Sequence, residues 1–444
     1  MPSASPPPTR ASALGPWLGV AAVGALVFAA AVIPDATGWD VASRRDGRGW
    51  EPLHGYVEVK VGPGTLPAAL LALLGAGYAG RLARALPWRP LLLVSFVAGL
   101  LWLLSLALVD GTDGLTRVLG NPYEYLETAR AVTSVGTTLD EFVDRIPYAH
   151  DDNWVTHVAG HPPGALLFFV GLVRVGLGGD LAASLVVTVL AATIPPAVLV
   201  TMRTLGAETA ARRAAPFLVL GPAAVFMAVS ADAVFTAVAA WGLAALAVAA
   251  TRPARGPAVA WSVLAGLLLG SCVLLSYGLP LLGFLAVAVL MAARSWLPLP
   301  VAAATALALV LGFAAGGFAW WEALPVLRER YWDGIASERP AAYWLWGNLA
   351  ALALSAGPVL GAGLACARRS TDRVVLLIVA GAAAAVLVAD LSQMSKAEVE
   401  RIWLPFVPWL LVVTAALPER WQRAGLTLQL ATALALQHFL YTSW

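Results

Sequence analysis

Hydrophobic residues occur along this chain in long runs that are separated by short polar connections. A helix that crosses a bilayer needs about 20 mostly apolar residues. Thirteen runs reach or approach that length, at 12–33, 66–86, 90–109, 181–201, 214–230, 234–250, 258–277, 279–293, 299–318, 344–366, 374–391, 404–417 and 424–441. The pattern predicts an all-α polytopic membrane protein with about 13 transmembrane helices.

One further apolar stretch, Pro162 to Leu177, does not fit this pattern. Its 16 residues would form a helix of about 24 Å, whereas the hydrocarbon core is about 30 Å thick. The stretch also opens with two prolines and carries Arg174. We therefore expect an interfacial or re-entrant helix that does not cross the membrane.

The charges follow the topology that results from this choice. With a cytoplasmic N-terminus, 15 basic and three acidic side chains lie on the inner side, a net charge of +12, and the rest of the chain carries −10. This asymmetry is the positive-inside rule. A crossing at 162–177 would invert every later loop. Four polar segments are then predicted outside, at 34–65, 110–180, 319–343 and 392–403.

Composition supports the same class. Hydrophobic residues make up 60% and charged residues 12% of the 444 positions, and the net charge is only +2. A soluble domain could not cover so much apolar surface, and a nucleic-acid-binding protein would need a basic excess. Cys272 and Cys366 do not indicate a disulfide framework or a zinc site. Abundant Ala and Arg with few Lys suggest a GC-rich bacterial genome.

The N-terminus is predicted as a disordered cytoplasmic segment, residues 1–11, because it is rich in Pro and Ser. A cleaved signal peptide is the alternative, but its apolar core should span only about 7–15 residues. The run that begins at residue 12 is longer. We therefore expect residues 12–89 to form a retained helix pair with an outer loop.

The outer segment 110–180 holds the densest set of candidate functional residues. Asp110 and Asp113 follow directly on a predicted span, and Tyr123 and Glu124 lie in a predicted helix start after Asn121. Acids and histidines on a loop next to a rigid scaffold often form a site. A solvated polar loop is the alternative for any single residue.

Several residues of this segment could bind a metal. His157 and His161 have the spacing of a zinc-protease helix, but Val158 stands where the general base Glu should be, so that class is excluded. An oxygen and nitrogen site for a divalent cation remains open, formed by His150, Asp151, Asp152 and His157.

Two later positions add charged candidates. Asp232 is placed at the outer end of one span and the start of the next, where it is either functional or a helix cap. Lys396, Glu400 and Arg401 lie in the outer segment 392–403. The two basic residues could bind a phosphate there or serve as interfacial anchors.

Together, these residues resemble the GT-C superfamily of integral-membrane glycosyltransferases. The similarity is to its protein-O-mannosyltransferase and aminoarabinose-transferase branch. It consists of an acid after an early span, a Tyr-containing juxtamembrane helix, His161-Pro162-Pro163 before a short apolar helix, Asp232, and Arg401 before Leu404-Pro405. It covers roughly residues 90–290 and 395–420. Residues 90–293 would then form the catalytic core, and 294–444 would complete the donor site.

The resemblance implies an enzyme of the plasma (inner) membrane with an extracytoplasmic site. It would move a sugar from a polyprenyl-phosphate donor to a hydroxyl of a glycan, lipid or protein of the cell envelope. The general base would be an outer-loop acid, with Asp113 preferred over Asp110 and Glu124, and Asp232 would be a second acid. His161, Tyr123, Arg174, Lys396, Glu400 and Arg401 would contact substrate. The extra N-terminal helix pair departs from the family.

Two other function classes remain as alternatives. A transporter or lipid flippase should show internal repeats, discontinuous helices and ionisable groups at mid-membrane. We detect no repeat in the sequence, and the predicted polar residues gather at one face. A non-catalytic scaffold does not explain acids on one side.

Overall fold

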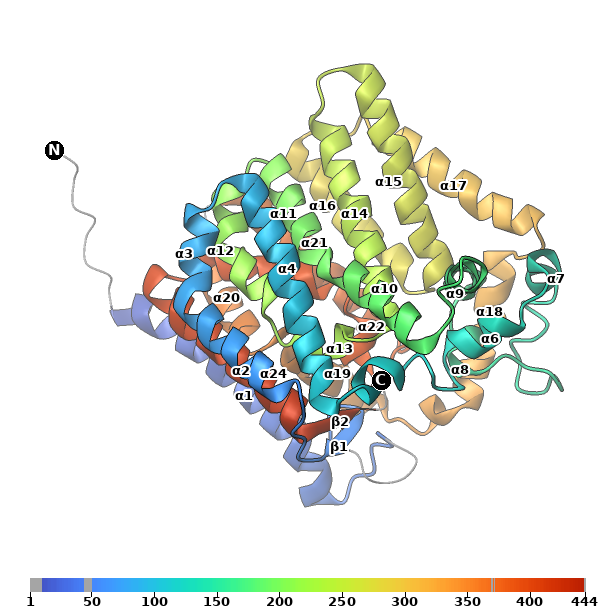
Figure 1. Ribbon diagram of the computed structural model, residues 1–444, viewed down its shortest axis with the longest axis horizontal. Coiled ribbons are helices and arrows are strands. Elements are labelled where there is room, and N and C mark those ends of the chain that lie inside the picture. The colour runs from blue at the N-terminus through green and yellow to red at the C-terminus, as the bar shows by residue number, and fades with distance from the viewer. Residues whose placement is uncertain (1–9, 44–49, 369, 371, 443–444) are drawn as a thin grey trace.

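The computed structural model describes residues 10–43, 50–368, 370 and 372–442, and most of them are helical (Figure 1). The first half contains α1 Arg10–Thr37, β1 Gly55–Val57, α2 Thr65–Leu74, the π-helix η1 Gly75–Ala79, α3 Gly80–Ala85, α4 Trp88–Ala107, η2 Leu108–Asp110, α5 Asp113–Thr116, α6 Tyr125–Ala131, α7 Val135–Asp140, α8 Thr156–Ala159, α9 Pro163–Arg174, α10 Asp180–Ala192, α11 Ile194–Thr204 and α12 Glu208–Val219. The second half contains α13 Ala223–Met227, α14 Ala231–Thr251, α15 Arg255–Leu275, η3 Leu279–Leu281, α16 Leu282–Ala293, α17 Leu299–Ala315, α18 Trp320–Asp333, η4 Ile335–Ser337, α19 Ala341–Ala356, α20 Val359–Ala367, α21 Arg373–Leu391, α22 Val399–Ile402, α23 Val407–Leu411, η5 Val412–Ala416, α24 Glu419–Phe439 and β2 Leu440–Thr442. Residues 1–9 of the segment 1–11, which was predicted to be disordered, lie outside the described residues.

Seven helical segments within the described residues are long and apolar enough to cross a membrane. They are Leu14–Thr37, Thr65–Ala85, Trp88–Asp110, Asp180–Thr204, Ala231–Thr251, Arg255–Leu275 and Arg373–Leu391. Two bent pairs raise the number to nine if each pair is one span. The chain is therefore a helical, multi-pass membrane protein, and the count of about 13 crossings stays a prediction.

Several predicted runs are interrupted in the structure. The run at 344–366 becomes α19 and α20, which are bent by 101°. Gly357 lies between them with φ of 86°, in the left-handed region that favours glycine. The run at 214–230 ends as α12 and resumes as the short α13 after Gly221 and Pro222. Apolar content alone does not reveal these breaks.

The stretch predicted not to cross forms α9, with 12 helical residues. Figure 1 shows α9 nearly end-on, whereas α14 and α15 are seen from the side. The helix is amphipathic in its packing, since Leu166, Phe169 and Val170 are buried whereas Arg174 is exposed. It packs against α6 and α15. This arrangement agrees with an interfacial or re-entrant helix.

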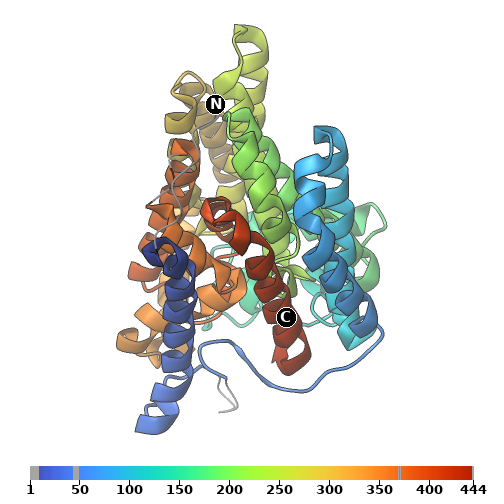
Figure 2. The same cartoon turned by 90° about the vertical axis from the view of Figure 1, so that its left-hand side faces the viewer.

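The four segments predicted to lie outside meet at one end of the bundle. Lys60 pairs with Asp110 at 3.0 Å, the His54 amide donates to Glu400, and Arg330 donates to Asn153. Figure 2 shows the chain after α1 crossing to α2 at this end, near the C-terminal end of α24. There β1 pairs antiparallel with β2. Which side of the membrane this end faces stays a prediction.

The opposite end carries four of the arginines that were predicted to be cytoplasmic. Arg203 and Arg212 pair with Glu208, and Arg84 and Arg213 pair with Glu419. These pairs join the turn between α11 and α12 to α3 and to the start of α24. The charged residues are thus sorted between the two ends of the helices.

Candidate functional site

The candidate site is a buried cluster of charged side chains around Arg401, which is 4% exposed. Its guanidinium lies 3.1 Å from a carboxylate oxygen of Asp232 and 3.8 Å from one of Glu124. It is also 3.6 Å from Glu398 and 3.2 Å from Nε2 of His157. These partners come from three distant parts of the chain, so the fold assembles the cluster.

Arg401 is positioned by an unusual loop, residues 392–403. Gln393, Ala397 and Glu398 all have φ near +60°, a conformation that costs free energy for non-glycine residues. The buried Asn348 of α19 holds this loop in place. It donates to the Ser395 carbonyl and to Asp390, and its own oxygen accepts from the Ala397 amide.

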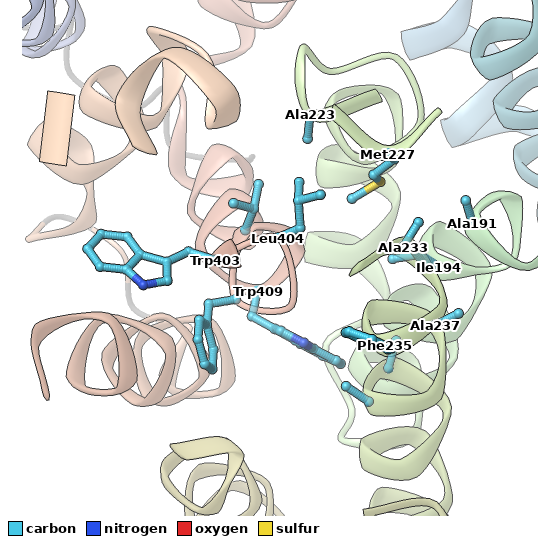
Figure 3. Packing of buried hydrophobic residues seen from close by; sticks show 14 of the residues in the cluster. Ala191, Ile194, Ala223, Met227, Ala233, Phe235, Ala237, Trp403, Leu404 and Trp409 are labelled. Carbon is cyan, nitrogen blue, oxygen red and sulfur yellow. The ribbon is translucent and has the colours of Figure 1, made fainter. Parts of the chain in front are cut away.

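Apolar packing behind the loop fixes it against α13 and α14 (Figure 3). Trp403 and Leu404 follow Arg401 almost directly and are at most 1% exposed. Figure 3 shows Trp409 extending from α23 toward Phe235 and Ala237 of α14. Because α14 also carries Asp232, this packing sets the distance between Asp232 and Arg401.

Glu124 stands at the start of α6 and is 2% exposed. Its Oε1 lies 2.8 Å from Nδ1 of His157. Arg401 can only donate, so Nε2 of His157 accepts from it, and Nδ1 is then the protonated ring nitrogen that lies beside Glu124. Burial alone would raise the pKa of Glu124, but the neighbouring His157 and Arg401 lower it. Glu124 is therefore a carboxylate at neutral pH, and among the described residues nothing hydrogen-bonds its Oε2.

Asp232 lies in the first turn of α14 and is 4% exposed. The helix is capped by Ser230, whose hydroxyl accepts from the Asp232 amide and donates to the Asp232 carboxylate, both at 3.1 Å. Asp232 is therefore not the helix cap that the sequence offered as one alternative: it lies in the first turn, where a negative charge is favoured, and its carboxylate faces Arg401. Its functional role stays a prediction.

Aromatic rings form one wall of the cluster. Tyr125 is 1% exposed and stacks on Phe169 of α9, with ring centroids 5.2 Å apart. His161 lies edge-on to Tyr125 and donates from Nδ1 to the His157 carbonyl at 2.9 Å. Burial lowers the pKa of His161, although the charge of Asp232 opposes this effect. His161 is then a neutral ring with Nε2 as an acceptor.

Two glutamates of the loop differ sharply in protonation. Burial would raise the pKa of Glu398, but His54, Arg339 and Arg401 bring it down to about 2. Burial raises the pKa of Glu400 to about 7, against a hydrogen bond from the His54 amide. Glu398 belongs to the charge network of Arg401, whereas Glu400 is a buried acid that is half protonated near neutral pH.

Four other predicted site residues lie apart from this cluster. Asp110 pairs with Lys60 and accepts from Gln437 at 3.2 Å. Asp113, the preferred general base, is exposed at the start of α5, and the structure shows no bond from its carboxylate to another described residue. Tyr123 and Arg174 are also exposed.

Lys396 is buried, and its contacts hold the loop 392–403 in place. Its Nζ donates to the carbonyls of Ala336 and Arg339 and lies 4.5 Å from the ring centroid of Trp332. Burial lowers its pKa, and so does Arg339. These contacts join 392–403 to η4 and the residues after it, which is a structural role.

The structure does not bring the predicted metal ligands together. Asp152 pairs with Arg145 at 2.7 Å, Asp151 is exposed, and His157 faces Glu124 and Arg401. Nδ1 of His150 accepts from the Asp152 amide. Within the described part of the chain, no group of three or more His, Cys, Asp or Glu side chains could hold a metal ion. Whether the protein uses a divalent cation stays untested.

Sequence reasoning left three residues out of the site: Tyr125, Glu398 and His54. Tyr125 belongs to the juxtamembrane helix that supports the family resemblance, but the neighbouring Tyr123 was selected. Glu398 was visible in its charged segment, and only the left-handed backbone turns it toward Arg401. His54 reaches Glu398 at 3.6 Å from a segment without a recognisable motif.

The cluster can accept a proton at Glu124 and offers positive charge at Arg401. Comparison of the chain with protein-family models, with curated proteins and with solved structures finds no match. Functional inference therefore rests on the residues of this site.

Proposed function

We propose that the protein is a membrane glycosyltransferase of the GT-C type, which transfers a sugar from a polyprenyl-phosphate donor to an acceptor hydroxyl. Glu124 is the general base in this proposal. The observation that carries it is the Oε2 atom of Glu124, a buried carboxylate oxygen that no described residue hydrogen-bonds. An acceptor hydroxyl is a suitable partner for such an oxygen.

The proposed reaction is a single displacement. As the acceptor oxygen attacks the anomeric carbon, its proton passes to Oε2 of Glu124, and the bond from that carbon to the phosphate oxygen breaks. The electron pair leaves with the polyprenyl phosphate. Arg401 supplies positive charge for the phosphate, and Asp232 orients the Arg401 guanidinium at 3.1 Å. His157 orients Glu124.

The membrane setting is consistent with this donor. The site lies at one end of the long helices, where the headgroup of a membrane lipid would be, and α9 packs directly against the α6 helix that begins after Glu124. A lipid-linked sugar would reach such a site without leaving the bilayer.

The experiment that tests this proposal compares Glu124→Gln with Asp113→Asn. Purified protein is incubated with radiolabelled polyprenyl-phosphate sugars, and release of polyprenyl phosphate is measured. Loss of a general base lowers rates by about 10²–10⁴-fold, so Glu124→Gln should be nearly inactive. Asp113→Asn should keep its activity because Asp113 is exposed. The reverse result would return the role of base to Asp113, and activity in both variants would refute a base at either position.

A transporter or lipid flippase is the second candidate, and one observation favours it. The 101° bend between α19 and α20 is a discontinuity of the kind that transporters use. Asp390 of α21 is also buried and accepts from Asn348. Proteoliposomes that move a lipid-linked sugar between leaflets, with no release of polyprenyl phosphate, would support this candidate over the transferase.

A further inference from the structure

A polar cleft lies beside the Arg401 cluster, between α6, α7 and the loop 152–155. Its volume is about 470 Å³, within the usual range of ligand pockets. Its lining includes five hydroxyl side chains, Thr128, Thr133, Ser134, Thr137 and Thr138. The cleft contains none of the residues assigned to the reaction.

The cleft and the Arg401 cluster share a wall. Pro122 and Val155 line the cleft, and each stands two residues before a member of the cluster, Glu124 and His157. The His157 amide donates to the Tyr123 carbonyl at 3.2 Å and joins the two segments. On α6, Glu127 and Thr128 line the cleft while Tyr125 is buried on the side of the cluster. A ligand in the cleft would lie next to the segment that carries Glu124.

The charge of the cleft limits what it can bind. Its lining has three carboxylates, Glu127, Glu141 and Asp152, and one cation, Arg145. Arg145 is engaged, since it pairs with Asp152 at 2.7 Å and lies over the Trp154 ring at 3.6 Å. The excess of carboxylates disfavours an anionic ligand, whereas hydroxyl or amino groups could donate to the carboxylates of the lining.

Several hydrogen bonds fix the segment 152–155, which lines one side of the cleft. Trp154 donates from its indole to the Phe142 carbonyl at 2.9 Å. The buried Arg330 of α18 donates to the carbonyls of Ile146 and Trp154 and to the side chain of Asn153. A preformed cleft lowers the entropic cost of ordering a ligand.

We infer that this cleft binds the acceptor as a polyhydroxylated glycan that is neutral or amino-substituted. The glycan is an acceptor only if the proposed transfer reaction is correct, but its binding in the cleft can be measured without that reaction. It identifies the acceptor class as a glycan, in preference to a lipid or a protein.

The test is hydrogen exchange of the full chain in detergent micelles, read by mass spectrometry. Maltotriose and glucosamine trisaccharide at about 10 mM are the probes, and trigalacturonate is the anionic control. At least one of the first two should slow exchange in peptides covering 127–141 and 150–155, and trigalacturonate should not. The double variant Glu127→Gln/Thr133→Val should weaken binding about tenfold, because it removes a charged acceptor and a hydroxyl. Glu322→Gln, on the exposed face of α18, is the matched control and should bind as the wild type does.

Each other outcome would overturn the inference. These outcomes are no protection by either probe, equal protection in the double variant, stronger protection by trigalacturonate, or protection by CaCl₂ alone, which would assign the cleft to a cation. Because exchange is measured without donor, a cleft that binds glycan in an inactive protein would refute the transferase and leave glycan binding intact. An active enzyme whose cleft peptides show no protection by glycan would refute glycan binding in the cleft and leave the transferase proposal intact.

Discussion

The loop 392–403 contacts two sets of buried cations: Arg401 forms one, and Arg339 with Lys396 forms the other. The two sets differ in the groups that they bind. Arg401 faces the side chains of Glu124, Asp232, Glu398 and His157. Its neighbours Arg339 and Lys396 donate to backbone carbonyls, at Ala42, Ser43, Ala336 and on each other's residues. Arg339 also lies 3.6 Å from Glu398, which is the one carboxylate of this second set among the described residues. Both sets are at most 5% exposed at these cations.

Under the proposed function, the difference separates structural cations from a cation that acts on the substrate. A backbone carbonyl cannot move without moving the chain, so a cation that binds carbonyls holds its own segment and theirs together. A carboxylate side chain can rotate, accept a proton, or leave the cation when a ligand takes its place. Arg330 and Arg213 also donate to backbone carbonyls, at Ile146 and Ala415 among others. The contrast therefore predicts which substitutions change chemistry and which change stability.

The largest effect is expected at Arg401. Arg401→Gln leaves two buried carboxylates without their cation and should cost about 3–5 kcal/mol of stability. Arg401→Lys keeps the charge but loses the planar fork, so the folded protein should transfer sugar at least about 10²-fold more slowly. Thermal unfolding in micelles and release of polyprenyl phosphate measure the two effects. Arg213→Lys is the matched control and should keep the transfer rate; a fully active Arg401→Lys would break the comparison.

The next effect is a pH dependence of stability from Glu400. The pKa of this acid is about 7 in the folded protein, above its ordinary value of 4.5. The folded state therefore holds a proton that the unfolded chain releases, and the free energy of unfolding falls as pH rises from about 4.5 to about 7, by up to about 3 kcal/mol. Glu400→Gln cannot ionise and should gain stability relative to wild type across this window. Melting temperatures of both proteins at pH 5, 6, 7 and 8 give the answer, and parallel curves would contradict it.

Lys396→Met should act on stability alone. The substitution leaves the buried carbonyls of Ala336 and Arg339 without a donor, at a cost of about 1–3 kcal/mol. The transfer rate per folded molecule should stay within about twofold of wild type. A rate loss as large as that of Arg401→Lys would show that Lys396 contacts substrate, as the sequence first suggested.

The smallest effect is expected at the surface of the same end. Asp152 pairs with Arg145, but its side chain is 80% exposed. Exposed pairs contribute about 0–1 kcal/mol, so Asp152→Asn should melt within a few degrees of wild type. A large loss of activity on this substitution, restored by added divalent cation, would reinstate the predicted metal site.

The sequence predicts long uninterrupted spans well and broken ones poorly. The runs at 234–250, 258–277 and 374–391 correspond to α14, α15 and α21 within a few residues, because apolar length alone defines them. The bend at Gly357 and the short α13 depend on packing against other helices, which one apolar run does not record. The count of about 13 crossings stays a prediction, because the structure breaks several of the runs on which it depends.

The site shows a similar division. Glu124, Asp232, His157, His161 and Arg401 were all among the candidates, because charged and histidine residues are conspicuous near apolar helices. Their assembly around Arg401 was not predictable, since it depends on contacts between residues 124, 232 and 401. The proposal of Glu124 over Asp113 as general base likewise rests on burial, which nearby acidic residues in one loop do not reveal.

The pairing of β1 with β2 has a consequence for biosynthesis. Residues 55–57 are made several hundred residues before their partners at 440–442. Glu124 and Asp232 must likewise wait for Arg401, so both carboxylates are present in the nascent chain without their cation. The end of the bundle that carries the site is therefore completed only after residue 442 has been made, and a chain cut short before residue 401 would insert its early helices but never form the charge cluster.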